Sequence, residues 1–225
     1  MKKFTWSLCL LAIALCISLP AMADDTFYTN LNSDPNNLYD CCTGWTISGT
    51  GTIGSYQAIA TEFMSGLTGS ISQIDIGVGI VTGDNSFYAA LYTDAGGALG
   101  DQLGRWDNLS SPQQEGGCCG VISITGITGI NLTANMSYFL VVAPEDPGAT
   151  TWGAWNFNNT GVNSQQLFST DGGVTWNNGG VTTAGAFQVL GSSGGGGTTP
   201  EPSSLVLLGT GLVGAFATMR RRMMK

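Results

Sequence analysis

Residues 69–81 read GSISQIDIGVGIV, and apolar side chains alternate with polar or small ones along much of this stretch. A two-residue period is typical of a half-buried β-strand, because successive side chains point to opposite faces of a sheet. Other short runs rich in β-branched and aromatic residues are bounded by Gly, Asn, Asp and Ser. These further predicted strands cover residues 56–63, 86–92, 102–108, 121–124, 137–143, 152–157, 165–169 and 184–190.

The region around these strands shows no long 3.6-residue apolar period, which argues against helices. Many short strands with frequent turn residues predict an all-β fold, a jelly-roll-like β-sandwich. We expect this sandwich to form one domain over residues 24–190, which is long enough to bury a substantial core. A Gly/Ser-rich linker, residues 191–199, follows the domain.

The N-terminus has the three parts of a secretory signal peptide. Two lysines form a basic start, residues 4–19 carry no charge, and Ala21-Met22-Ala23 places small residues at the −3 and −1 positions. We expect signal peptidase to remove residues 1–23, so that the mature chain begins at Asp24. The alternative is an uncleaved membrane helix, for which the apolar core is short.

The C-terminus combines a motif, an apolar run and a basic tail. The motif is Pro200-Glu201-Pro202, an uncharged run follows over about 203–219, and Arg220, Arg221 and Arg222 begin the basic tail, residues 220–225. A helix that rises about 1.5 Å per residue would make the uncharged run a transmembrane helix just long enough for a thin bilayer. The basic tail would stay in the cytoplasm, which leaves the domain on the outer side of the membrane.

This order of parts, over residues 200–225, resembles the PEP-CTERM sorting signal. The resemblance implies that an exosortase, a sorting protease of the inner membrane, recognises the Pro-Glu-Pro tripeptide and cleaves near it. It also implies a Gram-negative bacterium that makes exopolysaccharide. The protein would be anchored in the inner membrane before processing and would then reach the cell surface or the extracellular matrix. A simple tail anchor that is never cut is the alternative.

The charges of the chain exclude several functions. Between residues 24 and 190 the chain has fourteen acidic residues and a single basic one, Arg105, which gives a net charge of −13. Nucleic-acid binding is excluded on this ground, because phosphate neutralisation needs Lys and Arg. The chain has no histidine, which excludes Ser-His-Asp and Cys-His catalytic sites and any histidine-ligated metal.

Two pairs of adjacent cysteines, Cys41-Cys42 and Cys118-Cys119, lie in the predicted domain. Disulfides are expected after export, and four cysteines allow three connectivities. We favour the two connectivities that link one pair to the other, because a bond between adjacent cysteines strains the peptide between them. Zinc held by four thiolates is disfavoured, since adjacent cysteines lack the usual C-x₂-C spacing.

One motif and several aromatic residues suggest sites. Residues 169–176, STDGGVTW, match the Asp-box pattern S-x-D-x-G-x-T-W, which we interpret as a structural hairpin turn. Aromatic faces stack on sugar rings, so Trp106, Trp152 and Trp155 are candidate ligand-binding residues, with core packing as the ordinary alternative. No metal site or cofactor is assigned. Acidic loops leave Ca²⁺ possible, without a residue assignment.

The segments CCTGW, residues 41–45, and YTDAGG, residues 92–97, give the domain a resemblance to choice-of-anchor domains, which have no assigned activity. The first hypothesis is therefore a non-enzymatic surface or matrix protein that binds extracellular polysaccharide. A carboxylate-dependent glycan hydrolase or lyase is the second hypothesis, and it would require two carboxylates about 5–10 Å apart in a cleft. A structural envelope component without a ligand is the third.

Overall fold

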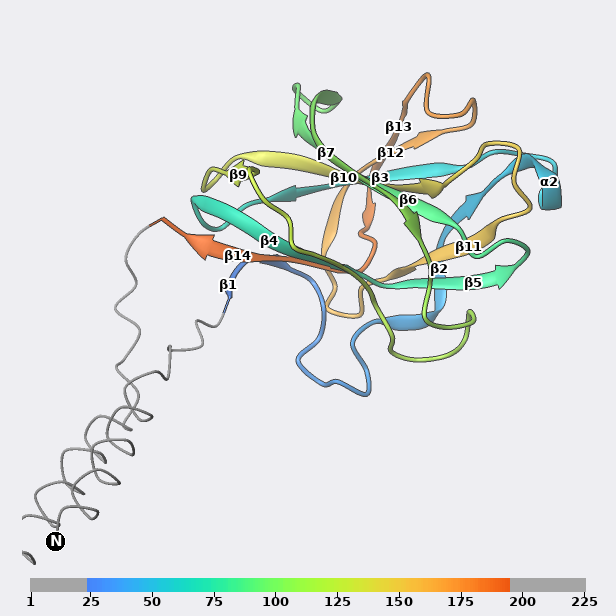
Figure 1. The fold of residues 1–225 in the computed structure, drawn as a ribbon, viewed down its shortest axis with the longest axis horizontal. Helices are drawn as coiled ribbons and strands as arrows, with labels where there is room; N and C mark the ends of the chain where they lie inside the picture. The colour runs from blue at the N-terminus through green and yellow to red at the C-terminus, as the bar shows by residue number, and fades with distance from the viewer. Residues whose placement is uncertain (1–23, 195–225) are drawn as a thin grey trace, which may run out of the picture. The chain divides into compact units, whose positions relative to one another are not determined.

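The computed structural model describes residues 24–194, and this part of the chain is an all-β sandwich (Figure 1). The predicted fold class is thereby confirmed. The predicted signal peptide, most of the linker, the sorting motif, the transmembrane helix and the basic tail lie outside the described residues. Within residues 24–194, no helix is long and apolar enough to cross a membrane.

One layer of the sandwich is a six-stranded antiparallel sheet with the order β13-β12-β3-β10-β6-β7. Its strands are β13 (Asn177–Thr183), β12 (Asn163–Ser169), β3 (Ala58–Met64), β10 (Ser137–Pro144), β6 (Phe87–Asp94) and β7 (Leu99–Leu109). The longest segment of this sheet is β7, which pairs with β6 through three register shifts. The two edges of the sheet are therefore β13 and β7.

The facing layer consists of two smaller sheets (Figure 1). The first contains β1 (Asp25–Thr29), β14 (Phe187–Ser193), β4 (Gly69–Ile76), β8 (Ile122–Thr125) and β9 (Asn131–Leu132). The second contains β2 (Asp40–Ser48), β11 (Trp152–Phe157) and β5 (Val78–Thr82). A single helical turn, α2 (Thr50–Ile53), follows β2.

The stretch 69–81 forms two strands instead of the predicted continuous one, with the break at Gly77. The Gly77 N–H donates to the carbonyl of Ala186, while the Gly77 carbonyl accepts from Asn156. A Cβ at this position would lie 2.9 Å from the ring of Tyr39. This close approach requires glycine, and it lets one run of sequence pass from the first small sheet to the second.

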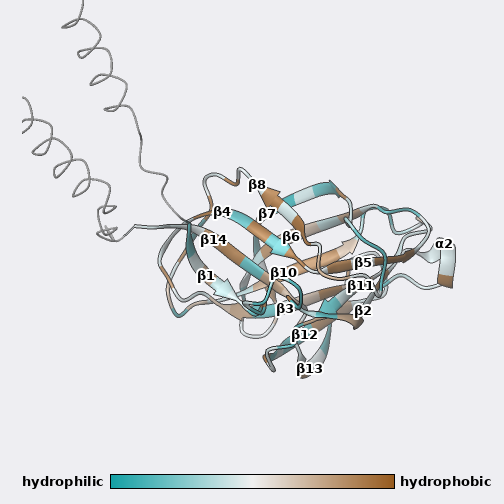
Figure 2. Ribbon diagram, turned by 90° about the horizontal axis from the view of Figure 1, so that it is seen from below, coloured by the Kyte–Doolittle hydropathy of each residue, from teal (hydrophilic) through white to brown (hydrophobic). Residues whose placement is uncertain are grey.

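The burial of β4 depends on a bulge that the alternating pattern does not reveal. Between Ile71 and Gln73, β4 advances by two residues while β14 advances by only one, so Ser72 is the extra residue. The bulge shifts the alternation of the strand by one residue, so both Ile71 and Ile74 are buried in the core although they are three positions apart. Hydrophobic and hydrophilic bands alternate along β4 in Figure 2.

The main core lies between the two layers and contains side chains from all three sheets. Trp155 on β11 is completely buried, its ring centroid lies 5.8 Å from that of Phe187, and its indole N–H donates to the carbonyl of Ala186 at 3.0 Å. A second apolar cluster, which we call the outer-face cluster, lies on the other side of the six-stranded sheet. It consists of Tyr56, Ala58, Ala60, Tyr88, Ala90, Phe139, Val141, Ala143 and Leu167.

Four strands escape the sequence analysis because their residues lack an apolar pattern. These are β1, β2, β9 and β13, of which β13 reads NNGGVTT. In addition, β14 extends to Ser193, so the first three residues of the predicted linker belong to the sheet. Pairing with β4 explains this extension, because Ser192 and Ser193 lie opposite Ser70 and Gly69. In addition, the Ser193 backbone N–H and hydroxyl both donate to the carboxylate of Asp25 on β1.

Candidate functional site

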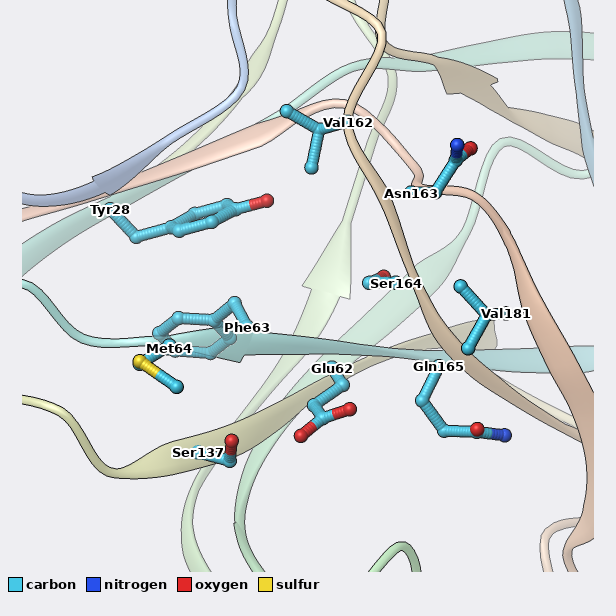
Figure 3. A pocket seen from close by; sticks show the side chains of 10 residues that line it. All are labelled: Tyr28, Glu62, Phe63, Met64, Ser137, Val162, Asn163, Ser164, Gln165 and Val181. Carbon is cyan, nitrogen blue, oxygen red and sulfur yellow. The ribbon is translucent and has the colours of Figure 1, made fainter.

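Two hollows lie beside the β12–β13 hairpin. The first, which we call the Tyr28 hollow, has a volume of about 350 Å³ (Figure 3). Its apolar lining consists of Tyr28, Phe63, Met64, Val162 and Val181, and its polar lining consists of Glu62, Ser137, Asn163, Ser164 and Gln165. Strands from both layers contribute, since Tyr28 belongs to β1 and the others to the six-stranded sheet or the segment before β12. This mixture of apolar and polar side chains is typical of a small-molecule site.

The hydroxyl group of Tyr28 points into this hollow (Figure 3). It is buried and has no hydrogen-bond partner among the described residues. Asn30 is nearby, and its side chain acts to lower the pKa of Tyr28, while its Nδ2 donates to the carbonyl of Gly185 and its Oδ1 accepts from the backbone N–H of Phe187. Burial raises the pKa of Tyr28 to about 12, so the hydroxyl keeps its proton at neutral pH. A buried polar group without a partner is costly, which points to a ligand atom that would complete the pair.

Aromatic packing fixes the position of the Tyr28 ring. Its centroid lies 4.7 Å from that of Phe187 and 5.2 Å from that of Phe63, and both contacts are tilted. Phe63 in turn contacts Tyr138 at 5.8 Å and Phe187 at 5.4 Å. The ring that carries the hydroxyl is therefore held in place by the core of the sandwich.

The other polar groups of the hollow suit hydrogen bonding rather than hydrolysis. Asn163 and Gln165 offer amides, Ser137 and Ser164 offer hydroxyls, and Glu62 is the one acidic residue of the lining. Glycoside hydrolysis generally uses two carboxyl groups that flank the scissile bond. Among the lining residues, Glu62 is the one carboxylate.

The second hollow, which we call the Trp45 hollow, has a volume of about 270 Å³. Trp45, Gln57, Ile59, Gln166, Leu167, Phe168 and Gly179 line it. The indole N–H of Trp45 donates to the carbonyl of Thr183 at 3.0 Å, and its ring packs edge-on against Phe157. Phe168 is 38% exposed, so this hollow offers aromatic surface to the solvent on the same hairpin as the first.

The structure does not bring the three predicted tryptophans together at either hollow. Trp155 is completely buried in the core, so its prediction as a ligand-binding residue is wrong, and the core packing of the indole is the physical reason. Trp106 and Trp152 are half-buried, and Trp106 packs against the main core. The residues that sequence reasoning missed are Tyr28 and Trp45, which lie on strands that carried no clear strand signal.

The two cysteine pairs lie on neighbouring segments, as the similar flanking residues suggested. The backbone N–H of Gly116 donates to the carbonyl of Cys41 at 2.8 Å, which joins the two segments. In the structure Cys118 is paired with its neighbour Cys119, whereas Cys41 and Cys42 are unpaired. This pairing differs from the favoured connectivities, and the disulfides that form after export stay a prediction.

The surroundings of Cys42 disfavour its thiolate form. The thiol of Cys41, whose Sγ lies 3.8 Å away, and then the carboxylates of Asp40 and Glu115 raise the pKa of Cys42. Only the thiolate attacks a disulfide, so a raised pKa slows exchange. In residues 24–194, no three His, Cys, Asp or Glu side chains are grouped in a way that would hold a metal ion.

The Asp-box residues form the turn between β12 and β13, which confirms the structural interpretation. The carboxylate of Asp171 accepts hydrogen bonds from the backbone N–H and hydroxyl of Thr175 and from the hydroxyl of Ser169. The indole N–H of Trp176 donates to the carbonyl of Gly173, which has a φ of 85°. Trp176 packs against the outer-face cluster, so the motif stabilises the hairpin that flanks both hollows.

Comparison with known proteins identifies the end of the chain. The family model of the PEP-CTERM protein-sorting motif matches residues 198–222, which include the Pro-Glu-Pro tripeptide and the arginines at 220–222. No curated protein matches the chain in sequence. The motif marks an exported protein that is processed at the membrane, and it implies an exosortase as the processing partner. The chain thus carries a PEP-CTERM sorting signal, which a β-sandwich domain precedes.

Proposed function

We propose that this exported protein binds polysaccharide through the Tyr28 hollow and does not modify it chemically. The observation that carries the proposal is the buried Tyr28 hydroxyl, which points into the hollow without a partner. A sugar oxygen would accept a hydrogen bond from this hydroxyl. The amides of Asn163 and Gln165 and the aromatic rings would supply the remaining contacts, since polysaccharide sites combine planar polar groups with apolar ring faces.

The attachment points of the domain support display from a single tail. β1 begins at Asp25, and β14, which pairs with it, ends at Ser193, so both ends of the domain lie side by side (Figure 1). A domain with this geometry can be attached to the membrane through one C-terminal segment without a change in its fold. We place the protein in the inner membrane before processing, and afterwards at the cell surface or in the matrix of a Gram-negative bacterium.

The binding test compares two matched tyrosine variants. Tyr28→Phe removes the unpartnered hydroxyl and keeps the ring, whereas Tyr92→Phe removes a hydroxyl on β6 that already donates to Gln102. The purified domain is applied to immobilised exopolysaccharide from its own host, and the bound fraction is measured. Loss of one ligand hydrogen bond of about 1 kcal/mol should weaken binding roughly fivefold in Tyr28→Phe, with no change in Tyr92→Phe.

The same experiment separates the proposal from its rivals. Retention with equal affinity in both variants would move the site away from the Tyr28 hollow. Release of shorter oligosaccharides or unsaturated products would favour the hydrolase or lyase. Absence of any retention would favour a structural envelope component and would overturn the proposal.

Sorting is tested separately with the full chain in its host. Replacement of Pro200, Glu201 and Pro202 by alanine should leave the tail attached and keep the protein in the inner-membrane fraction. Mass spectrometry of the wild-type protein should find a C-terminus near the motif. An identical mass and location for both proteins would contradict exosortase processing.

A further inference from the structure

We infer that the Tyr28 hollow selects uncharged sugar units and rejects uronate, sulfated and phosphorylated ones. This inference rests on the proposed polysaccharide binding and adds the chemical class of the ligand. It is carried by the placement of the few charged groups around the hollow.

The domain offers no positive charge to an acidic sugar at this place. Arg105 is the one basic residue between positions 24 and 194, against fourteen acidic residues. It belongs to β7, which is the edge of the six-stranded sheet opposite to β13. The strand of the lining that lies nearest to the arginine is β10, which contributes Ser137, and β6 separates it from β7.

Arg105 is also occupied by its own neighbours. Its Nε donates to the carboxylate of Asp107 at 2.6 Å, and its guanidinium carbon lies 3.6 Å from the centroid of the Tyr88 ring. An arginine that binds a carboxylate or phosphate usually presents its planar fork to the anion. Here Asp107 engages Nε, and the plane of the guanidinium lies over the Tyr88 ring.

Within the hollow, Glu62 is the single charged side chain of the lining. An ionised carboxylate only accepts hydrogen bonds, so it would bind sugar hydroxyls and would repel an anionic substituent. Hydrogen bonds to an ionised acceptor are also stronger than those between neutral groups. Glu62 thus favours neutral hydroxyls and acts against sugars that carry negative charge.

The remaining groups fit a neutral sugar. Tyr28 keeps its proton, because burial raises its pKa to about 12, so it presents an O–H donor to a sugar oxygen. Asn163 and Gln165 can each donate and accept. The volume of about 350 Å³ lies at the small end of the range for ligand sites, which suits a short sugar segment rather than a long one.

The experiment measures retention of the purified domain on a panel of neutral and acidic polysaccharides, at low and high NaCl and with EDTA present. Dextran, galactan and β-glucan represent the neutral class, and alginate, hyaluronate and a sulfated galactan represent the acidic class. We expect retention on a neutral polymer with less than about a twofold dependence on salt, since neutral ligands release no counterions. Retention on acidic polymers alone would overturn the inference while leaving polysaccharide binding intact.

Two variants with the same change in net charge locate the effect. Glu62→Gln should weaken binding of the neutral polymer roughly tenfold, because a charge-assisted hydrogen bond is lost. Asp101→Asn, on the opposite edge strand β7, should leave binding unchanged. Equal effects of the two variants would mean that net charge sets the selectivity, and would overturn the role of Glu62. Failure of every polymer to retain the protein would instead refute the proposed function itself.

Discussion

Substitution of Gly185 by alanine is expected to destabilise the domain strongly. A Cβ at this position would lie 2.6 Å from both Cδ2 and Nε1 of the Trp155 indole, whereas ordinary van der Waals contact begins at about 3.4 Å. The indole is completely buried, so it has to move within a packed core. Such overpacking costs about 1–3 kcal/mol.

The displacement of the ring has a second cost. The indole N–H donates to the Ala186 carbonyl at 3.0 Å, and a buried donor that loses its acceptor costs about 1–3 kcal/mol. Together the two effects predict a loss of about 3 kcal/mol for Gly185→Ala. For a domain of this size, the melting temperature should fall by about 6–12 °C.

Thermal and urea unfolding followed by circular dichroism measure this loss. Gly66→Ala is the matched control, because the nearest atom to its Cβ would be the Phe27 carbonyl oxygen at 3.4 Å, and its stability should change by less than about 1 kcal/mol. In a Trp155→Phe background the smaller ring leaves space, so Gly185→Ala should cost at least about 1 kcal/mol less. A cost below about 0.5 kcal/mol, or an equal cost in both backgrounds, would refute the reasoning.

Three further predictions concern polar groups. Without reductant, the unfolded domain should react with two equivalents of maleimide, at Cys41 and Cys42, and after reduction it should react with four. Absence of any reaction before reduction would show that disulfides link the two cysteine pairs instead. Hydrogen bonds to its carboxylate lower the pKa of Asp171 from 3.8 to about 2. The contribution of Asp171 to stability is therefore present above about pH 4 and is lost as the pH falls toward 2. Urea unfolding from about pH 5 to about pH 2 should show this loss of stability in the wild type and a smaller loss in Asp171→Asn. Thr61→Val should cost about 1–3 kcal/mol in urea unfolding, since the buried Gln166 carbonyl loses its donor at 2.8 Å, and adding Gln166→Leu should recover part of that cost.

Several features of the domain could be predicted from residues that are neighbours along the chain. The bounds of β11 and the approximate bounds of β10 and β12 follow from β-branched and aromatic runs, because such residues favour strands whatever their partners. The Asp-box turn is equally local, since Asp171 bonds residues within four positions of itself. Other features depend on distant partners. β13 reads NNGGVTT and becomes a strand only because β12 pairs with it.

The sequence by itself determined the fold class, the acidic and histidine-free character of the domain and the sorting signal at its end, since these depend on composition and on neighbours along the chain. Only the tertiary structure decided which aromatic residues are accessible. Trp155 packs against Phe187 and is buried in the core. Tyr28 lies at a hollow, where contacts with Phe63 on β3 and Phe187 on β14 hold its ring. The physical reason is that accessibility depends on what packs against a side chain, and those neighbours come from strands far away in the sequence.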